Sequence, residues 1–228
     1  MRLPAIIVNF KLYEQGTGID ALNLAKIHQQ VADETGASIA IAVNALDLAE
    51  VANSVNIPVF LQHMDYVGYG SFTGHILPEL VKEKGAYGVI LNHAERPLEN
   101  QHLELGIQRA KDAELFTIVC ANTPEFATKC KEWGPDLIAM EPPELIGGDI
   151  SVSKAGPHII EEAVKMVGSG KLLVGAGVKE GDDVDIALAL GASGVLLASG
   201  VVKSEDPYSA LMEIVSGLKK CHGFDTCP

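Results

Sequence analysis

Three residues able to do acid–base or electrostatic chemistry stand at the ends of apolar runs in this chain: Lys11, His93 and Glu141. A buried carboxylate is costly unless it has a task. A lysine directly after a buried strand can offer a fixed positive charge to an anionic substrate, and histidine changes charge near neutral pH. Taken singly, each residue also fits a structural role, as a solvated loop lysine, a satisfied histidine or part of an ordinary turn.

Two glycine-rich segments could bind the anionic group of such a substrate. They read Gly175-Ala176-Gly177 and Ala198-Ser199-Gly200, and each follows an apolar run. Small residues let backbone N–H groups approach a phosphate closely. Either segment alone could be a tight turn, but both fall on the same series of strand ends as the lysine, histidine and glutamate.

The segment after Glu141 has the composition of a lid. Pro142 and Pro143 stiffen its first half, and Gly147 and Gly148 free its second half. A loop that closes as a rigid body needs such hinges at both ends. The alternative is an ordinary proline-rich turn.

Eight short apolar runs position these residues, and most are continuously apolar rather than alternating. This pattern is typical of parallel strands buried on both faces. The runs are Ala5–Asn9, Ile39–Val43, Val59–Gln62, Gly88–Asn92, Phe116–Cys120, Leu137–Glu141, Leu172–Gly175 and Val195–Ser199.

Helical patterns with start and stop signals lie between the runs. Leu24, Ile27 and Val31 form one apolar stripe, which Thr35-Gly36 ends. The helix starts are predicted from side chains that can cap a first turn, some followed by proline. These signals are Asn44 before Ala45–Ala52, Thr123-Pro124-Glu125, Asp182 (with Gly191 at the far end of its helix) and Asp206-Pro207.

Eight β/α units without a linker predict one α/β domain, a closed (β/α)8 TIM barrel over residues 1–219, with residues 220–228 as a C-terminal tail. At 228 residues the loops and some helices must be abbreviated. An open doubly wound sheet is the alternative, and the absence of Gly-x-Gly-x-x-Gly after the first run disfavours it. Barrel sites lie at the C-terminal ends of the strands, where the candidate residues stand.

The net charge and the composition disfavour two classes of partner, nucleic acids and membranes. Lys and Arg number 17 against 30 Asp and Glu, a formal net charge of −13, so nucleic acid is an unfavourable partner. No apolar run approaches the roughly 18 residues of a membrane span, and we find no signal-peptide segment. We therefore expect a cytoplasmic protein that does not bind membranes.

The four cysteines give no paired C-x-x-C spacing of a zinc or redox motif. Cys120 lies inside an apolar run and fits a small core residue. Cys221, His222 and Cys227 stand together near the C-terminus, where a loose surface tail and a metal or disulfide site both remain open.

Eight motifs in their order along the chain resemble the triosephosphate isomerase family in its short archaeal form, across about residues 4–218. They are NFKLY at 9–13, QHMD at 62–65, GSFTGH at 70–75, NHAE at 92–95, EPPELIG at 141–147, VSKA at 152–155, GAG at 175–177 and LLASG at 196–200.

The resemblance implies interconversion of dihydroxyacetone phosphate and D-glyceraldehyde 3-phosphate, with Glu141 as the base, His93 as the electrophile that polarises the carbonyl and Lys11 as a catalytic cation. No metal or organic cofactor is required if Lys11 and His93 stabilise the negative charge, and nothing in the sequence suggests one. The substrate-binding residues that the resemblance implies are Asn9, Phe10, Lys11, Ile146, Gly147, Gly177, Ala198 and Ser199.

The resemblance also implies a homo-oligomer, at least a dimer in which Met64–His75 docks near a neighbour's site, and a tetramer in short archaeal members. The chain departs from the family pattern at Ala94, where a serine is usual, and at Gly147-Gly148-Asp149, where Gly-Thr-Gly is usual. These departures bear on the open-site geometry and on phosphate affinity.

Two alternatives remain beside this function. A barrel that binds a phosphorylated metabolite without turning it over could carry similar motifs, but it would not need Glu141 together with His93 and Lys11. Another sugar-phosphate isomerase or epimerase is disfavoured because metal-ligand His/Asp pairs are absent from the strand ends.

Overall fold

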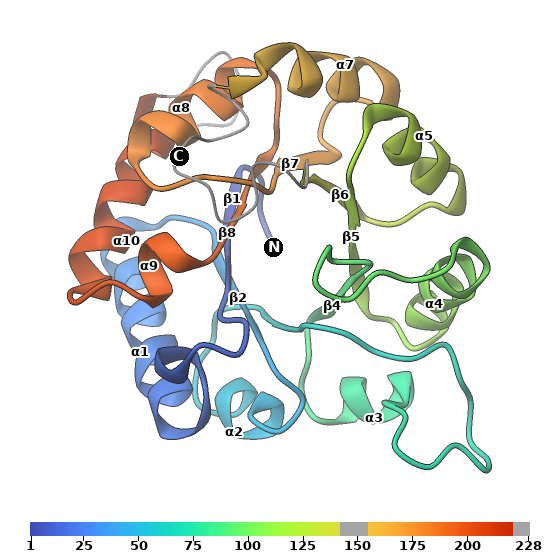
Figure 1. Ribbon diagram of the computed structural model, residues 1–228. Coiled ribbons are helices and arrows are strands. Elements are labelled where there is room, and N and C mark those ends of the chain that lie inside the picture. Colours follow the sequence, from blue (N-terminus) through green and yellow to red (C-terminus); the bar gives the residue numbers. More distant parts are fainter. Residues whose placement is uncertain (142–154, 221–228) are drawn as a thin grey trace.

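The computed structural model describes residues 1–141 and 155–220, and in this part of the chain eight parallel strands close into a barrel in sequence order (Figure 1). Ile6 pairs with Ile39 on one side of the first strand, and Ala5 pairs with Gly194 of the last strand to complete the ring. The strands are β1 Ala5–Asn9, β2 Ile39–Val43, β3 Val59–Leu61, β4 Gly88–Leu91, β5 Phe116–Ala121, β6 Leu137–Met140, β7 Leu172–Val174 and β8 Gly194–Leu197.

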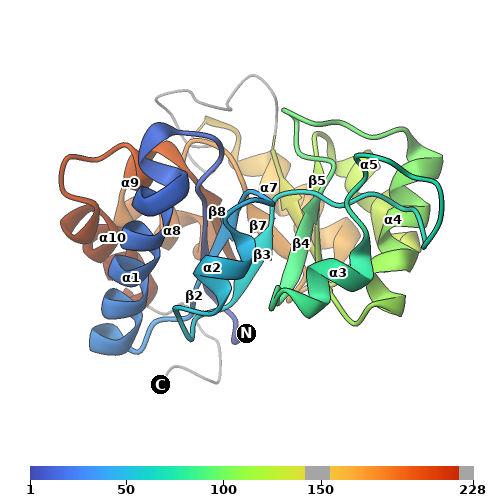
Figure 2. The ribbon, with the colours of Figure 1, turned by 90° about the horizontal axis from the view of Figure 1, so that it is seen from below.

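Helices surround the barrel and connect its strands (Figures 1 and 2). The helices between β2 and β4 are short, with five residues in α2 and six in α3, which agrees with the expected abbreviation of some helices. The helices are η1 Glu14–Gly16, α1 Gly18–Thr35, α2 Leu48–Ala52, α3 Pro78–Glu83, α4 Asn100–Asp112, α5 Pro124–Trp133, α7 Pro157–Val167, α8 Gly181–Ala189, α9 Ser199–Val202, α10 Pro207–Ser216 and η3 Gly217–Lys220.

The predicted closed barrel is confirmed, but several strands end before the polar residues that the sequence assigned to them. Gln62, Asn92, Glu141 and Gly175 lie just beyond their strands, and Ser199 begins α9. Asn92 shows the reason locally, because its backbone has turned into the left-handed region at φ 59° and cannot continue a strand. Lys11, His93 and Glu141 therefore lie in loops that follow the strands.

Three of the expected helix signals are present. Gly36 ends α1 in the left-handed conformation, Thr123 accepts a hydrogen bond from the Phe126 N–H, and Asp206 accepts one from the Ser209 N–H. Asn44 accepts from Leu46 and Asp47 but caps a turn, since α2 itself begins only at Leu48.

The expected cap at Asp182 is wrong. Glu180 caps α8, and it forms a reciprocal capping box with Asp183, whose side chain accepts from the Glu180 N–H. The reason is a register difference of two residues, because the helix begins at Gly181 and places Asp182 inside its first turn.

Two apolar clusters make the core. The smaller one fills the barrel interior, and the larger one lies between strands and helices. In the described part of the chain, no helix is long and apolar enough to cross a membrane. The interior cluster contains Ile7, Ala40, Ala42, Phe60, Ile90, Ile118, Cys120, Leu137, Ala139, Leu173 and Leu196.

Candidate active site

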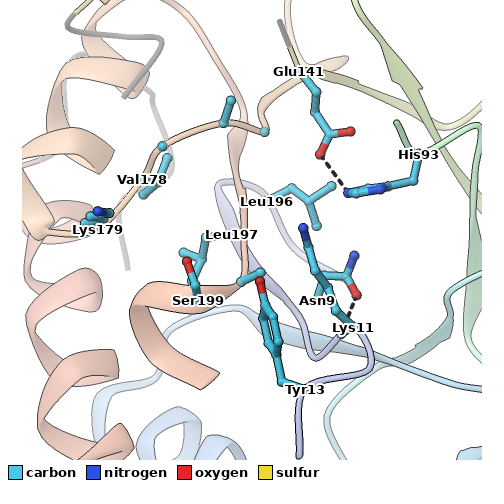
Figure 3. A pocket seen from close by; sticks show the side chains of 14 residues that line it. Asn9, Lys11, Tyr13, His93, Glu141, Val178, Lys179, Leu196, Leu197 and Ser199 are labelled. Carbon is cyan, nitrogen blue, oxygen red and sulfur yellow. Dashed lines mark hydrogen bonds and ion pairs between the residues drawn. The ribbon is translucent and has the colours of Figure 1, made fainter. Parts of the chain in front are cut away.

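A pocket at the C-terminal ends of the strands gathers side chains from β1, β4, β6, β7 and β8 (Figure 3). Closure of the barrel places the ends of all these strands around one opening, so residues more than a hundred positions apart share one pocket. Its lining residues are Asn9, Lys11, Tyr13, His93, Glu141, Gly175, Ala176, Gly177, Val178, Lys179, Leu196, Leu197, Ala198 and Ser199.

A strained turn after β1 presents Lys11. Its backbone is left-handed at φ 51°, a conformation that costs a non-glycine residue on the order of 1 kcal/mol. Two side chains hold the turn: Asn9 Oδ1 accepts from the Lys11 N–H at 3.0 Å, and Gln62 Nε2 donates to the Lys11 carbonyl at 3.0 Å. The Lys11 ammonium lies 2.7 Å from Glu95 Oε1. Its positive charge is thus fixed at the edge of the pocket.

The loop after β4 fixes both the position and the proton of His93. Asn92 ties this loop to β5, because its Nδ2 donates to the Cys120 carbonyl at 2.9 Å. The Glu95 N–H donates to His93 Nδ1 at 3.1 Å, so that nitrogen is an acceptor and the proton of the neutral ring sits on Nε2. Burial first, and then the Lys11 charge, lower the pKa of His93. The ring is therefore a neutral hydrogen-bond donor facing the pocket.

Glu141 follows β6 and is almost completely buried. Its backbone N–H donates to the Ala121 carbonyl at 2.8 Å, which continues the β5–β6 ladder to the carboxylate. Burial raises the pKa of Glu141 to about 7, although the Cys120 thiol and the Lys11 charge pull the pKa down. Its Oε1 lies 3.5 Å from His93 Nε2 (Figure 3). A carboxylate of this kind can take up a proton near neutral pH.

Gly175 makes the room that the Glu141 side chain needs. A Cβ at position 175 would lie 2.4 Å from Glu141 Cγ and 3.1 Å from Oε1. The sequence suggested that this glycine lets backbone approach an anion. In the structure its absent side chain also leaves space for the carboxylate.

Most residues expected from the sequence meet in this pocket: Asn9, Lys11, His93, Glu141, Gly177, Ala198 and Ser199. Phe10 does not line it, because its side chain points into the core and packs on His28 with ring centroids 5.2 Å apart. Alternation along the chain sends Asn9 and Phe10 to opposite sides. Ile146 and Gly147, with the expected lid, lie outside the described residues, as do Cys221, His222 and Cys227.

Sequence reasoning missed several pocket residues, among them Tyr13, Val178, Lys179 and Leu196. Tyr13 had a usable signal, because it stands two residues after Lys11 in the same loop. Lys179 stands two residues after Gly177, a comparable signal. Among residues 1–141 and 155–220, no group of three or more His, Cys, Asp or Glu is placed to hold a metal ion.

This arrangement suits proton transfer next to a carbonyl. Such a reaction needs a base, and it needs donors for the negative charge that develops on oxygen. Glu141 is the group that accepts a proton near neutral pH, His93 donates from Nε2, and Lys11 supplies a positive charge in a protein of net charge −13.

Comparisons with known proteins agree on one family. The sequence model of the family described as triosephosphate isomerase matches residues 4–217. The chain is 44% identical over 219 residues to the triosephosphate isomerase of Methanosarcina barkeri, covering 94% of this chain and 99% of that protein. It is 44% identical over 222 residues to the enzyme of that name from Pyrobaculum calidifontis, covering 96% and 97%.

A solved structure shares the fold. The crystal structure of triosephosphate isomerase from Bartonella henselae superposes with a TM-score of 0.72, at 22% identity, over 95% of this chain and 99% of that one.

Proposed function

The chain belongs to the triosephosphate isomerase family, and from this premise we propose that it interconverts dihydroxyacetone phosphate and D-glyceraldehyde 3-phosphate through an enediolate. The observation that carries the proposal is the facing pair of a buried carboxylate with a pKa of about 7 and a neutral imidazole whose proton is on Nε2. A purely structural site, or a site that only binds a ligand, does not need both the buried carboxylate and the neutral imidazole.

In the proposed reaction, Glu141 removes a proton from the carbon beside the carbonyl and returns it to the neighbouring carbon. The electron pair of the broken C–H bond becomes the enediolate double bond, and the carbonyl oxygen gains negative charge. His93 Nε2–H hydrogen bonds this oxygen and passes its proton to it, and the ring nitrogen takes up the proton of the neighbouring hydroxyl. The second oxygen thereby becomes the new carbonyl when Glu141 returns its proton to the other carbon, and Lys11 stabilises the negative charge of the intermediate. A base with a pKa near the working pH is both available in its ionised form and strong enough to remove the proton.

Binding of the phosphate is assigned to small residues on the opposite side of the pocket. We propose that Gly177, Ala198 and Ser199 bind this group, together with Ile146 and Gly147 of the segment outside the described residues. Asn9 binds substrate and, through its Oδ1, also holds the Lys11 turn. For Phe10 we propose an indirect contribution, since its buried side chain packs on His28 of α1 and so anchors the chain between Asn9 and Lys11.

A second copy of the chain completes the proposed functional unit. Residues 69–75 form an exposed loop whose Tyr69 and Phe72 are 76% and 45% exposed. A hollow of about 590 Å³ beside the site is lined by Lys11, Leu12, His93 and Glu95 among others. Exposed aromatic groups and a hollow of this size favour docking of Met64–His75 from a neighbour. We propose a dimer at least, and a tetramer as the assembly of short archaeal members.

We propose residues 1–219 as the single catalytic domain, with 220–228 as its tail. A dianionic triose phosphate does not cross an apolar bilayer. We therefore propose that the enzyme works where its substrate is made, in the cytoplasm.

A coupled assay tests the function. Purified protein is given D-glyceraldehyde 3-phosphate, and dihydroxyacetone phosphate is reduced by a coupled dehydrogenase so that its formation is followed. We expect saturable isomerisation in the wild type and a fall in kcat of at least ~10³ in Glu141→Gln, which keeps the shape of the side chain but not its basicity. Turnover that is absent from the wild type, or unchanged in the variant, would refute the proposal.

A further inference from the structure

The pocket holds a second lysine, Lys179, for which the chemistry above has no use. It lines the pocket together with Lys11 but comes from the loop between β7 and α8. Figure 3 shows it on the side of the pocket opposite His93, next to Val178 and near Ser199. This is the side to which the phosphate was assigned, some way from the base.

The aliphatic part of the Lys179 side chain lies against the start of α9. A Cβ at Gly200 would lie 3.4 Å from Lys179 Cα and 3.8 Å from its Cγ. Because position 200 has no side chain, the lysine stem packs against the first turn after Ser199. The base of the lysine side chain is thereby placed beside α9, on the side of the pocket that Gly177 and Ser199 also line.

The residues that follow Lys179 are mostly acidic, so an anionic ligand on this side of the pocket needs a nearby positive charge. Three acidic residues, Glu180, Asp182 and Asp183, lie within the four positions after Lys179. The buried Asp183 carboxylate accepts from the N–H groups of both Lys179 and Glu180 at 2.9 and 3.2 Å. Protein carboxylates therefore already engage the start of α8, and their charge would repel a phosphate dianion.

We propose that Lys179 is a binding residue for the phosphate group: its ammonium offsets the acidic start of α8 and attracts the dianion of the substrate. This inference rests on the proposed function, because it takes a phosphorylated triose as the ligand. Lys179 acts on affinity and not on proton transfer, since it lies across the pocket from Glu141 and His93. Lys11 serves the reacting end and Lys179 the phosphate end.

The test compares Lys179→Gln with Lys179→Arg, which keeps the charge, and with Lys26→Gln. Lys26 is exposed on α1, so its loss changes the net charge equally, from −13 to −14, away from the pocket. We measure kcat and KM for D-glyceraldehyde 3-phosphate, inhibition by inorganic phosphate, and kcat/KM for unphosphorylated glyceraldehyde.

In Lys179→Gln we expect KM and the inhibition constant of inorganic phosphate to rise about 3- to 10-fold, with kcat within about twofold of wild type. The effect should shrink at high salt, because ions screen the attraction. Lys179→Arg and Lys26→Gln should stay near wild type, and turnover of unphosphorylated glyceraldehyde should be the same in all four proteins.

Unchanged KM and phosphate inhibition in Lys179→Gln would overturn the inference while leaving the isomerase function intact. So would an equal change in Lys26→Gln, or a fall in kcat alone. If the wild type lacks isomerase activity, the proposed function fails by itself, and calorimetric binding of inorganic phosphate to wild type and Lys179→Gln still decides the role of the lysine.

Discussion

At the scale of single residues, the site depends on a carboxylate that the fold keeps out of water. Burial raises the pKa of Glu141 to about 7, so folding disfavours the ionised form. The free energy of unfolding is therefore highest when Glu141 is protonated. This stability is fully present below the ordinary pKa of 4.5 and is lost as the pH rises through about 7. The ionised carboxylate of Glu141, which acts as the base, thus lowers the stability of the fold at pH values above about 7.

We therefore expect Glu141→Gln to be more stable than wild type at pH 8, by about 1–3 kcal/mol, because a neutral amide replaces a buried charge. The difference should nearly vanish at pH 4, below the ordinary pKa of 4.5, where the carboxyl is protonated in both the folded and the unfolded chain. Urea unfolding at both pH values measures it. An equal difference at both would mean that the charge of Glu141 is not its cause.

The contact between Gly175 and Glu141 gives a second prediction. In Gly175→Ala the added methyl group would overlap Glu141 Cγ, so the carboxylate must move. We expect kcat to fall about 10- to 100-fold, since misplacing a catalytic group by about an ångström has effects of this order.

Gly106→Ala is the matched control. Its Cβ would meet only Leu91 Cδ1, at 3.6 Å, and it lies inside α4. Normal kcat in this variant and a reduced kcat in Gly175→Ala would assign the effect to the carboxylate. Equal kcat values would show that the site tolerates the methyl group.

At the scale of elements, lysines link successive helices at the end of the barrel away from the site. Lys82 of α3 donates to the Glu114 carbonyl after α4, and Lys111 of α4 donates to the Trp133 carbonyl that ends α5. Lys131 of α5 continues the series to the Met166 carbonyl in α7. The final carbonyls of a helix lack intrahelical partners and carry partial negative charge, so each lysine stabilises the end of the next helix.

We expect Lys111→Met to lower the free energy of unfolding by about 0.3–1 kcal/mol, as is usual for a cation at a helix C-terminus. Its kcat should remain normal because the change is remote from the pocket. Lys26→Met, on the exposed face of α1, controls for loss of one charge. Urea unfolding compares the three proteins, and equal stability of both variants would remove the role given to the Lys111–Trp133 contact.

At the scale of the whole molecule, the loop at residues 69–75 projects from the barrel with its aromatic side chains exposed. In the single chain Tyr69 and Phe72 remain 76% and 45% exposed, and the hollow beside the site has a volume of about 590 Å³. Assembly would cover both surfaces in one step. It would also make the site depend on protein concentration.

Thr73→Glu should therefore yield smaller species with little activity, because it places a charge in the proposed contact. Asn23→Glu, exposed on α1, adds the same charge elsewhere and should leave the assembly intact. Light scattering coupled to size exclusion gives the mass, and activity is measured on the same fractions. A wild type that is a compact, active monomer would contradict the proposed assembly.

Much of this molecule follows from local sequence. The eight apolar runs and caps such as Thr123 predict the barrel because hydrophobic pattern and capping act between near neighbours. Lys11, His93 and Glu141 could be named from their positions after strands, since a closed barrel brings strand ends together. The strand ends themselves were less certain, because backbone turns such as that at Asn92 depend on contacts with β5.

Only the tertiary structure decided how those residues work. The proton on His93 is set by a backbone N–H two residues away, and the room for Glu141 comes from Gly175 across the β6–β7 boundary. The packing of Phe10 on His28 of α1, and the presence of Lys179 in the pocket, likewise depend on which side of the chain faces the barrel interior. Sequence spacing identifies residue types at strand ends. The loop conformation that sets the His93 proton is tied to β5 through Asn92, and the burial and room of Glu141 likewise come from residues distant in the sequence.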